Sequence, residues 1–298
     1  MSKTRATFTA LAAATAALLG APGAASAEQI VGLTTGNALV LFDSATPGTA
    51  TAPVAISGLA AGESILGIDL RPATGAIYGL GSAGNLYTLN ASTGSATFVS
   101  LLKADPADLT SPYTALSGSA FGVDFNPVAD RLRIVSTTGQ NLRVNAANGN
   151  TTTDGNLNGA TTNAVAAAYT NNDNDAATTT TALFDISGLT DTLYTQAPPN
   201  DGTLVAVGSG LGVNTSDVAG FDISGTTGAA FASLTDANGA SRLYSINLAT
   251  GTATLIGANA TSLRDITVAA PIPEPETYAL MLAGLAAVGF AARRRSRG

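Results

Sequence analysis

The 298-residue sequence contains no cysteine, no histidine and no tryptophan. Without cysteine no disulfide can form, so a hydrophobic core has to stabilise the fold. Without histidine the sequence excludes Ser-His-Asp and Cys-His nucleophilic sites, the usual general base near neutral pH, and ordinary zinc sites. The absence of tryptophan removes the usual centre of a sugar-stacking platform. These absences leave few of the common routes to catalysis.

Lysine and glutamate are scarce between residues 28 and 272. Lys103 is the only lysine there, and Glu28 and Glu63 are the only glutamates. Ser-Lys catalysis and paired-glutamate glycosidase chemistry therefore have very few candidate residues. An enzyme would depend on Asp, Tyr, Arg and a bound cation, so the sequence favours a non-enzymatic protein while leaving an enzyme open.

The N-terminus has the pattern of a secretory signal peptide. Lys3 and Arg5 precede an apolar run over residues 8–19, and small residues 25–27 come before Glu28. This order predicts a signal peptide over residues 1–27, Sec-type export and removal by signal peptidase after Ala27. A buried N-terminal helix is the alternative.

The chain between the two ends is acidic. Of 13 basic and 20 acidic residues in the whole chain, 7 and 18 remain once both ends are set aside, a net charge of about −11. This charge repels nucleic acid and anionic lipid, so we expect no nucleic-acid partner.

A β-hairpin recurs along the chain. NLYTLNASTGSATFV (85–99) matches RLYSINLATGTATLI (242–256), with Asn opening the turn and Gly near its end. Such alternating runs around Asn and Gly are typical of hairpins. Three further segments follow the pattern: 39–51, 141–153 and 192–208.

A second repeated element predicts an all-β fold, a β-propeller of five blades with about four strands each. Gly-apolar-Asp precedes the hairpins at Gly67–Asp69, Gly122–Asp124 and Gly220–Asp222. We expect four strands in each of four segments (65–100, 120–153, 164–208 and 218–257) and only three in 30–57. The segment 263–268 would supply the missing strand and close the ring by pairing with the N-terminal strands. A sandwich or a solenoid remains open, because spacing does not determine curvature.

The repeated aspartates Asp69, Asp124 and Asp222 are the candidate ligand residues. The first strand of a propeller blade lines the central channel, so the three carboxylates are expected to form a ring that would attract Ca²⁺. Asp265 is expected to join them. The alternative is that each Asp bonds backbone N–H groups of a neighbouring turn, and Ala166–Tyr169, which has no Asp, favours it. We therefore expect no cofactor and no catalytic residues, with Ca²⁺ as the cation that the pattern leaves open.

Arg131 and Arg133 alternate along one expected strand and would project from the same face. They would either grip the carboxylate of an anionic sugar or pair with the many aspartates. Between the repeats, residues 104–109 are expected to form a short helix.

The C-terminus resembles a PEP-CTERM sorting signal over residues 271–298. Pro273, Glu274 and Pro275 precede an apolar segment over 278–292 and an arginine cluster over 293–297 that includes Arg293, Arg294 and Arg295. The resemblance implies a Gram-negative exported protein, processed by an exosortase and linked to exopolysaccharide and biofilm.

The apolar segment 278–292 is expected to be a single short transmembrane helix. Its 15 residues span about 22 Å as a helix, less than the roughly 30 Å hydrocarbon core of a bilayer. It therefore predicts a transient inner-membrane anchor, after which the protein reaches the cell surface or the extracellular space.

Residues 28–270 resemble a bacterial secreted domain of unknown function that carries GIDxRPxTG (here 67–75) and DFNPxxDRLR (here 124–133). The resemblance implies no established catalytic residues. Together these features predict a non-enzymatic exported protein of the cell surface or matrix that binds polysaccharide or another protein. The alternative is a cation-dependent propeller enzyme, of lactonase or glycan lyase type, with a site at the channel mouth.

Overall fold

A computed structural model describes residues 27–175 and 177–269. The predicted signal peptide, apart from Ala27, and the whole predicted sorting signal with its apolar helix lie outside these residues. Within the described ranges, no helix is both long and apolar enough to cross a membrane.

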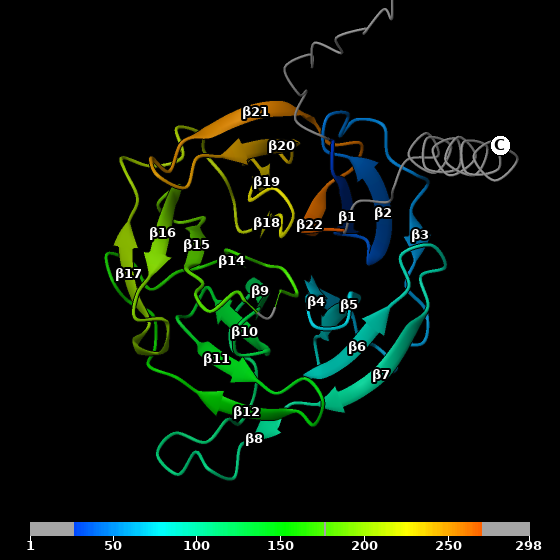
Figure 1. Ribbon diagram of the computed structural model, residues 1–298. Helices are drawn as coiled ribbons and strands as arrows, with labels where there is room; N and C mark the ends of the chain where they lie inside the picture. The colour runs from blue at the N-terminus through cyan, green and yellow to red at the C-terminus, as the bar shows by residue number, and fades with distance from the viewer. Residues whose placement is uncertain (1–26, 176, 270–298) are drawn as a thin grey trace, which may run out of the picture.

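The described chain forms five mainly antiparallel sheets arranged as blades around a central axis (Figure 1). The innermost strands, given in blade order, are β22 (Leu263–Val268), β4 (Ile65–Arg71), β9 (Phe121–Asn126), β14 (Ala166–Tyr169) and β18 (Ala219–Ile223). The second strands are β1 (Gln29–Thr34), β5 (Ala76–Gly81), β10 (Arg131–Ser136), β15 (Leu183–Ser187) and β19 (Ala230–Thr235).

Two further strands complete each blade on its outer side. The third strands are β2 (Ala38–Asp43), β6 (Asn85–Leu89), β11 (Asn141–Val144), β16 (Thr192–Gln196) and β20 (Ser241–Ile246). The fourth strands are β3 (Val54–Ala55), β7 (Ala96–Leu101), β12 (Asn150–Thr153), β17 (Thr203–Ala206) and β21 (Ala253–Ala258). The third and fourth strands of four blades are the repeated hairpins, so the predicted five-bladed propeller is confirmed.

The ring closes where the last strand joins the first blade. β22 pairs antiparallel with β1, with Val268 opposite Ile30 and Ile266 opposite Gly32. β22 also packs between β18 and β4, the innermost strands of the neighbouring blades. The closure predicted for 263–268 is therefore confirmed, and it leaves no unpaired inner edge on the first blade.

Each pair of neighbouring blades encloses its own apolar core, as between the fifth and first blades, where Phe231 and Leu243 pack with Ile30, Phe42 and Ile266. The innermost strands approach so closely that glycine is needed there. A Cβ on Gly220 would lie 2.5 Å from the Cα of Asp265, and one on Gly122 would lie 2.7 Å from the carbonyl carbon of Ala166. Backbone proximity thus explains the glycine of the Gly-apolar-Asp repeat.

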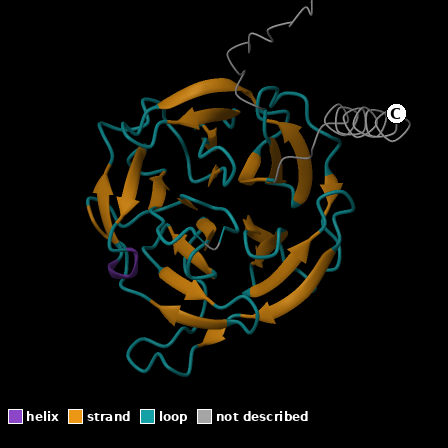
Figure 2. Cartoon of the chain, in the orientation of Figure 1, coloured by secondary structure: helices purple, strands orange, loops and turns teal. Residues whose placement is uncertain are grey.

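Two segments between blades add short outer strands to the third and fourth blades. β8 (Lys103–Ala104) pairs in parallel with β12, and β13 (Asn158–Gly159) pairs in parallel with β17. The helix expected over 104–109 is wrong: residues after β8 form turns in which Asp105 Oδ1 accepts a hydrogen bond from the N–H of Ala107. The described residues contain one short 3₁₀ helix, η1 (Pro199–Asp201), in the fourth blade (Figure 2).

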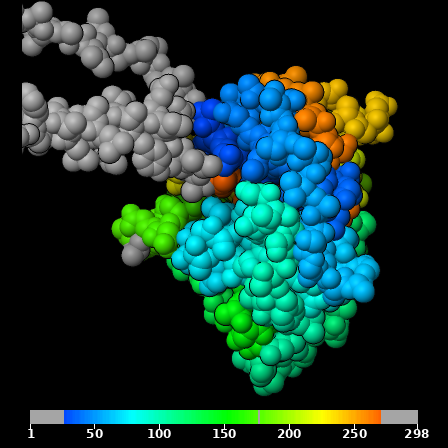
Figure 3. Space-filling model, turned by 90° about the vertical axis from the view of Figure 1, so that its right-hand side faces the viewer, coloured from blue at the N-terminus to red at the C-terminus, as the bar shows by residue number. Residues whose placement is uncertain are grey.

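The side view shows a disc from which the green segment near residues 170–180 protrudes on one face (Figure 3). This is the face on which the innermost strands end, because the segment follows β14 directly. We call it the strand-end face.

Candidate functional site in the central channel

The three repeated aspartates project from innermost strands toward the next blade. Asp69 Oδ2 accepts a hydrogen bond of 2.7 Å from the N–H of Phe125 in β9. Asp124 Oδ1 accepts one of 3.0 Å from the N–H of Tyr169 in β14. Asp222 Oδ2 accepts one of 2.6 Å from the N–H of Val268 in β22. Each carboxylate therefore links two neighbouring blades.

The equivalent position differs in the other two blades. In the first blade Thr267 takes it, and its hydroxyl accepts a hydrogen bond of 3.0 Å from the N–H of Leu70. In the fourth blade Ala168, which precedes Tyr169, takes it and offers no acceptor. Asp265 lies two residues before Thr267 and reaches a different amide, the N–H of Ile68, at 2.8 Å. The expectation that Asp265 is equivalent to the other aspartates is therefore wrong, because the register of β22 puts Thr267 at their level.

The structure brings Asp69, Asp124 and Asp222 together around one point. Each offers a carboxylate oxygen, and these oxygens all lie within 4.8 Å of one another. Two oxygens that bind one Ca²⁺ at up to 2.6 Å lie at most about 5.2 Å apart, so the spacing fits this ion. Asp124 Oδ2 is fully buried and has no hydrogen-bond partner among the described residues. An unpartnered buried carboxylate oxygen is costly, and a cation or a proton would offset that cost.

Burial controls the charge of this acid cluster, by which we mean Asp69, Asp124 and Asp222, each 1% exposed. Burial, followed by repulsion from Asp222, raises the pKa of Asp69 well above its usual value. Burial and the charges of the other two acids do the same to the pKa of Asp124. For Asp222 burial raises the pKa to about 7. Without a cation, the cluster therefore favours bound protons near neutral pH.

The hydroxyl of Thr267 connects two members of the cluster. It lies 3.1 Å from Asp69 Oδ1 and 3.0 Å from Asp222 Oδ2. A hydroxyl has one proton and can donate to only one of these oxygens. A proton on either carboxyl would complete the second contact, which agrees with the raised pKa of both groups.

Cavities lie at both ends of the channel, and neither is lined by the acid cluster. On the strand-end face, a cavity of about 240 Å³ is lined by residues that include Leu70, Asn172, Ser224 and Val268. At the opposite end, a cavity of about 160 Å³ is lined by residues that include Phe121 and Arg264. The carboxylates meet between the two ends of the channel, where interblade contacts cover them.

Asp185 in β15 is a buried acid that sequence reasoning missed. It is fully buried, and neither of its carboxylate oxygens has a hydrogen-bond partner among the described residues. Burial raises its pKa to about 8, although the nearby charge of Arg133 acts in the opposite direction. Its position as the only acid in the apolar run 182–186 was the available signal.

Comparison with solved structures finds several distant likenesses. A chain of a Nidogen/Laminin complex is 12% identical with a TM-score of 0.49, and the match covers 81% of this chain and 98% of that one. A Bacteroides thetaiotaomicron protein of unknown function is 12% identical with a TM-score of 0.45, covering 81% and 66%. TolB from Acinetobacter baumannii is 13% identical with a TM-score of 0.41, covering 78% and 53%. At these values the likenesses carry no conclusion about activity, and the chain has no significant match among curated proteins.

Two family models match the sequence. A PEP-CTERM protein-sorting motif matches residues 271–295, as the Pro-Glu-Pro and arginine pattern predicted. This motif implies export, sorting to the cell surface and processing by an exosortase. The second model matches residues 38–267, which is most of the propeller. The chain therefore belongs to the family described as Domain of unknown function (DUF4394).

Proposed function

We propose that this protein is a non-enzymatic component of the cell surface or extracellular matrix that binds an extracellular polysaccharide. The burial of its acid cluster carries the non-enzymatic part of the proposal, and the sorting motif at residues 271–295 supports the surface location. Asp69, Asp124 and Asp222 are each 1% exposed and line neither of the two channel cavities described above. A substrate cannot contact carboxylates that interblade hydrogen bonds cover, and a general acid or base must lie within hydrogen-bond reach of its substrate.

The same acid cluster is proposed as a structural cation site, with Ca²⁺ as the ion. Two observations support this site. The carboxylate oxygens lie within 4.8 Å of one another, and Asp124 Oδ2 has no hydrogen-bond partner among the described residues. One ion there would contact three blades at once. It would stabilise the ring and take no part in a reaction.

A cation-dependent enzyme of lactonase or glycan lyase type is the alternative function. The convergence of three carboxylates is the observation that favours it. This alternative requires the channel wall to open, so that a substrate in one of the cavities meets the ion.

The proposed export route begins with Sec-type translocation and removal of residues 1–27 by signal peptidase. The apolar segment 278–292 then holds the protein transiently in the inner membrane until an exosortase acts on the tail. Intact-mass measurement of the protein from its native host tests both steps. A mass that retains residues 1–27 or the complete tail would contradict the route.

One assay separates the binding protein from the enzyme. The full chain is mixed with the exopolysaccharide of its own host in the presence of Ca²⁺, and both the bound fraction and new chain ends are measured. We expect reversible binding without new ends. The enzyme would be established if the wild type produces new chain ends, Asp124→Asn does not, and a variant of the exposed Asp43 (Asp43→Asn) still does.

A further inference from the structure

Three arginines of the third blade line one cavity on the strand-end face, beside the fourth blade. The cavity measures about 220 Å³, and its lining includes Arg131, Arg133, Arg143, Tyr169, Pro199 and Asn200. Only seven basic residues lie between residues 28 and 272, so nearly half of them meet here in a strongly acidic protein. We call this cavity the arginine pocket.

The sheet geometry explains why the arginines meet. Arg133 in β10 lies directly opposite Arg143 in β11, so their side chains project from the same face of the sheet. Arg131 lies two residues before Arg133 in the same strand and shares that face. Residues of the fourth blade, including Tyr169 and the η1 residues Pro199 and Asn200, form the other wall.

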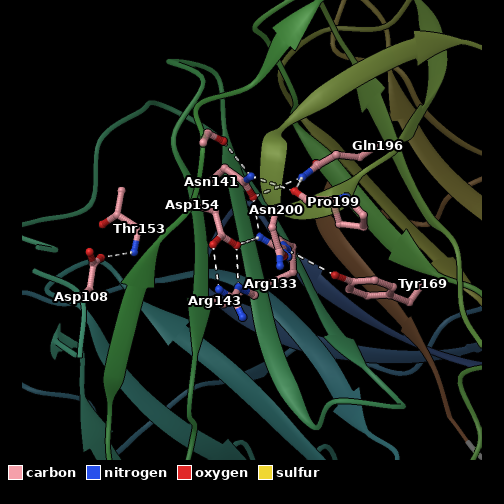
Figure 4. Close-up of polar contacts among 11 residues, drawn as sticks. Asp108, Arg133, Asn141, Arg143, Thr153, Asp154, Tyr169, Gln196, Pro199 and Asn200 are labelled. Carbon is pink, nitrogen blue, oxygen red and sulfur yellow. Dashed lines mark hydrogen bonds and ion pairs between the residues drawn. The ribbon is translucent and has the colours of Figure 1, made fainter. Parts of the chain in front are cut away.

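Arg133 is held rigidly at the base of the pocket (Figure 4). Its side chain is 2% exposed, and its Nε donates to the hydroxyl of Tyr169 at 3.2 Å. Nη1 donates to Asn141 Oδ1 and to Asp154 Oδ2, both at 2.7 Å, and Nη2 donates to Asn200 Oδ1 at 2.9 Å. A guanidinium fixed in this way is already ordered before a ligand arrives, which lowers the entropic cost of binding.

The pocket carries more positive than negative charge. Asp154 is shared between two guanidinium groups: it accepts from Arg133 and also from Nε and Nη2 of Arg143, at 2.7 and 2.9 Å. Arg131 has no ion-pair partner among the described residues, and its Nη1 donates to the carbonyl oxygens of Ala129 and Asp130. Asp130 also lies near Arg131, but it is ion-paired with Arg71. With this pair included, four guanidinium groups meet two carboxylates.

Asp185 does not remove this excess of positive charge. It lies close enough to Arg133 to interact with its charge, but burial raises its pKa to about 8. It is therefore mostly neutral at pH 7.

Donor groups of the half-buried Arg131 and Arg143 remain available. In the described part of the chain, the hydrogen bonds of Arg143 use Nε and Nη2, and those of Arg131 use Nη1. The other guanidinium nitrogens of these two residues are free to bind an anion. Guanidinium groups match the planar geometry of a carboxylate and bind it with paired hydrogen bonds.

We propose that the arginine pocket binds the carboxylate of a single acidic sugar unit. The inference rests on the proposed polysaccharide-binding function and names the chemistry of its ligand. A volume of about 220 Å³ lies below the roughly 300–1,000 Å³ of pockets that hold drug-sized ligands, which suits one sugar ring and not an oligosaccharide. Pro199 offers an apolar surface in the lining, and the amide nitrogen of Asn200 can donate to a sugar hydroxyl group while its Oδ1 accepts from Arg133.

Titration calorimetry with the full chain tests this proposal, with glucuronic acid as the probe and glucose and inorganic phosphate as comparisons. We expect glucuronate to bind and glucose not to bind. Arg143→Gln and Arg131→Gln should each raise the glucuronate dissociation constant about tenfold or more, because each removes a charge-assisted hydrogen bond. Added salt should weaken the binding.

Arg242→Gln is the matched control. Arg242 is 37% exposed, the same fraction as Arg143, and it also pairs with one aspartate, Asp236. It lies in β20 of the fifth blade, so its loss changes net charge equally and leaves the pocket intact. If Arg242→Gln raises the glucuronate dissociation constant as much as Arg143→Gln does, the effect comes from net charge alone and the proposed site is wrong.

The remaining outcomes separate the pocket from the proposed function. Absence of glucuronate binding, or binding of phosphate alone, overturns the carboxylate assignment. If the host polysaccharide binds the wild type and Arg143→Gln equally, the pocket is wrong and the proposed function stands. If glucuronate binds in the pocket but the polysaccharide does not bind at all, the proposed function fails and the pocket stands.

Discussion

Among single residues, position relative to the blade interfaces decides whether an aspartate acts as a charge or as a neutral hydrogen-bonding group. Asp154 is held between two arginines and remains an ion-pair partner. Asp124 and Asp185 are buried with oxygens that have no partner among the described residues. The ion pairs of Asp154 belong to a charged pocket. The unpartnered oxygens of Asp124 and Asp185 are costly to bury, and a bound proton or cation would offset that cost.

Calcium is expected to stabilise the protein through Asp124. At a Ca²⁺ concentration about 100-fold above the dissociation constant, the free energy of unfolding should rise by about 2.7 kcal/mol. For a domain of this size that corresponds to a rise in Tm of several degrees, about 2–4 °C per kcal/mol. Calorimetric melting with Ca²⁺ and then with excess chelator measures the difference, which Asp124→Asn should abolish.

Asp265→Asn is the control for this measurement. Asp265 is also a buried carboxylate of the channel but is not one of the three acids that meet at one point. A Ca²⁺ shift that survives in Asp124→Asn, or one that disappears equally in both variants, would contradict the cation site.

Asp185 is expected to make the protein less stable as pH rises. Its pKa is about 8 in the folded protein and near the ordinary value of 3.8 when unfolded, so between these pH values the folded state binds more protons. Its contribution to stability is therefore complete below pH 3.8 and is lost as pH rises through 8. In urea denaturation, Asp185→Asn should reduce the stability difference between pH 5 and pH 8 by about 2–4 kcal/mol.

The exposed Asp43 provides the comparison for this pH dependence. Its carboxylate accepts one local hydrogen bond from the N–H of Ala45, outside the blade interfaces. Asp43→Asn should leave the difference between pH 5 and pH 8 unchanged. A slope unaltered by Asp185→Asn would show that the carboxyl ionises freely in the folded protein.

Among the strands, the innermost ones impose the tightest steric limits. They contact one another directly around the axis, so their backbones approach more closely than side chains allow. The Gly-apolar-Asp repeat has two roles in these strands. Its glycine permits the close approach of the backbones, and its aspartate accepts a hydrogen bond from the next blade.

Gly220→Ala is expected to destabilise the fold by about 1–3 kcal/mol or more, because the new methyl group overlaps the backbone of β22. Chemical denaturation of this variant and of Gly36→Ala measures the effect. A Cβ on Gly36 would have its nearest neighbour at 3.7 Å, so that variant should retain wild-type stability. Equal stabilities of Gly220→Ala and the wild type would show that the innermost strands can move apart.

Much of the blade structure was predictable from the sequence, because its strands are local. The hairpin of 85–99 and its copy at 242–256 carry their turn residues at regular spacing. The closing strand followed from counting strands in each segment. The helix expected over 104–109 failed because Pro106 and the side chain of Asp105 favour turns there.

The site was less predictable, because it depends on contacts between blades. The repeat placed Asp69, Asp124 and Asp222 at equivalent positions, and the structure shows that they meet. Thr267 was missed, since only the register of β22 against β1 shows which of its residues reaches the level of the acids. The arginine pocket was predicted only in part: Arg131 and Arg133 were expected to share a face and to bind an anionic sugar or aspartates, and Arg133 does pair with Asp154. Arg143 and Asn200 were missed, because Arg143 comes from the next strand and Asn200 from the next blade.

For the whole molecule, closure of the ring depends on the last strand of the propeller. β22 supplies the first blade with its innermost strand, and it supplies the N–H of Val268 that donates to Asp222 of the fifth blade. Stability should therefore be shared around the ring and lost as a unit.

A chain that ends after Ser262 is expected to lose cooperative unfolding and to aggregate. Without β22, the inner edge of β1 is unpaired and the channel acids lose Thr267. Size-exclusion chromatography and thermal melting report the outcome. A chain that ends after Ala269 keeps β22 and should remain monomeric and cooperative. Cooperative unfolding of both chains would show that the ring does not need closure.

The position of the closing strand also limits how the protein is oriented during export. β22 ends at Val268 on the strand-end face, and the apolar segment that would enter the membrane begins ten residues later, at residue 278. Ten residues span at most about 36 Å. In the proposed export route, such a tether keeps this face on the membrane side of the propeller, and the arginine pocket with it. Removal of the tail would then do more than free the protein, because it would turn the ligand-binding face from the bilayer toward the matrix.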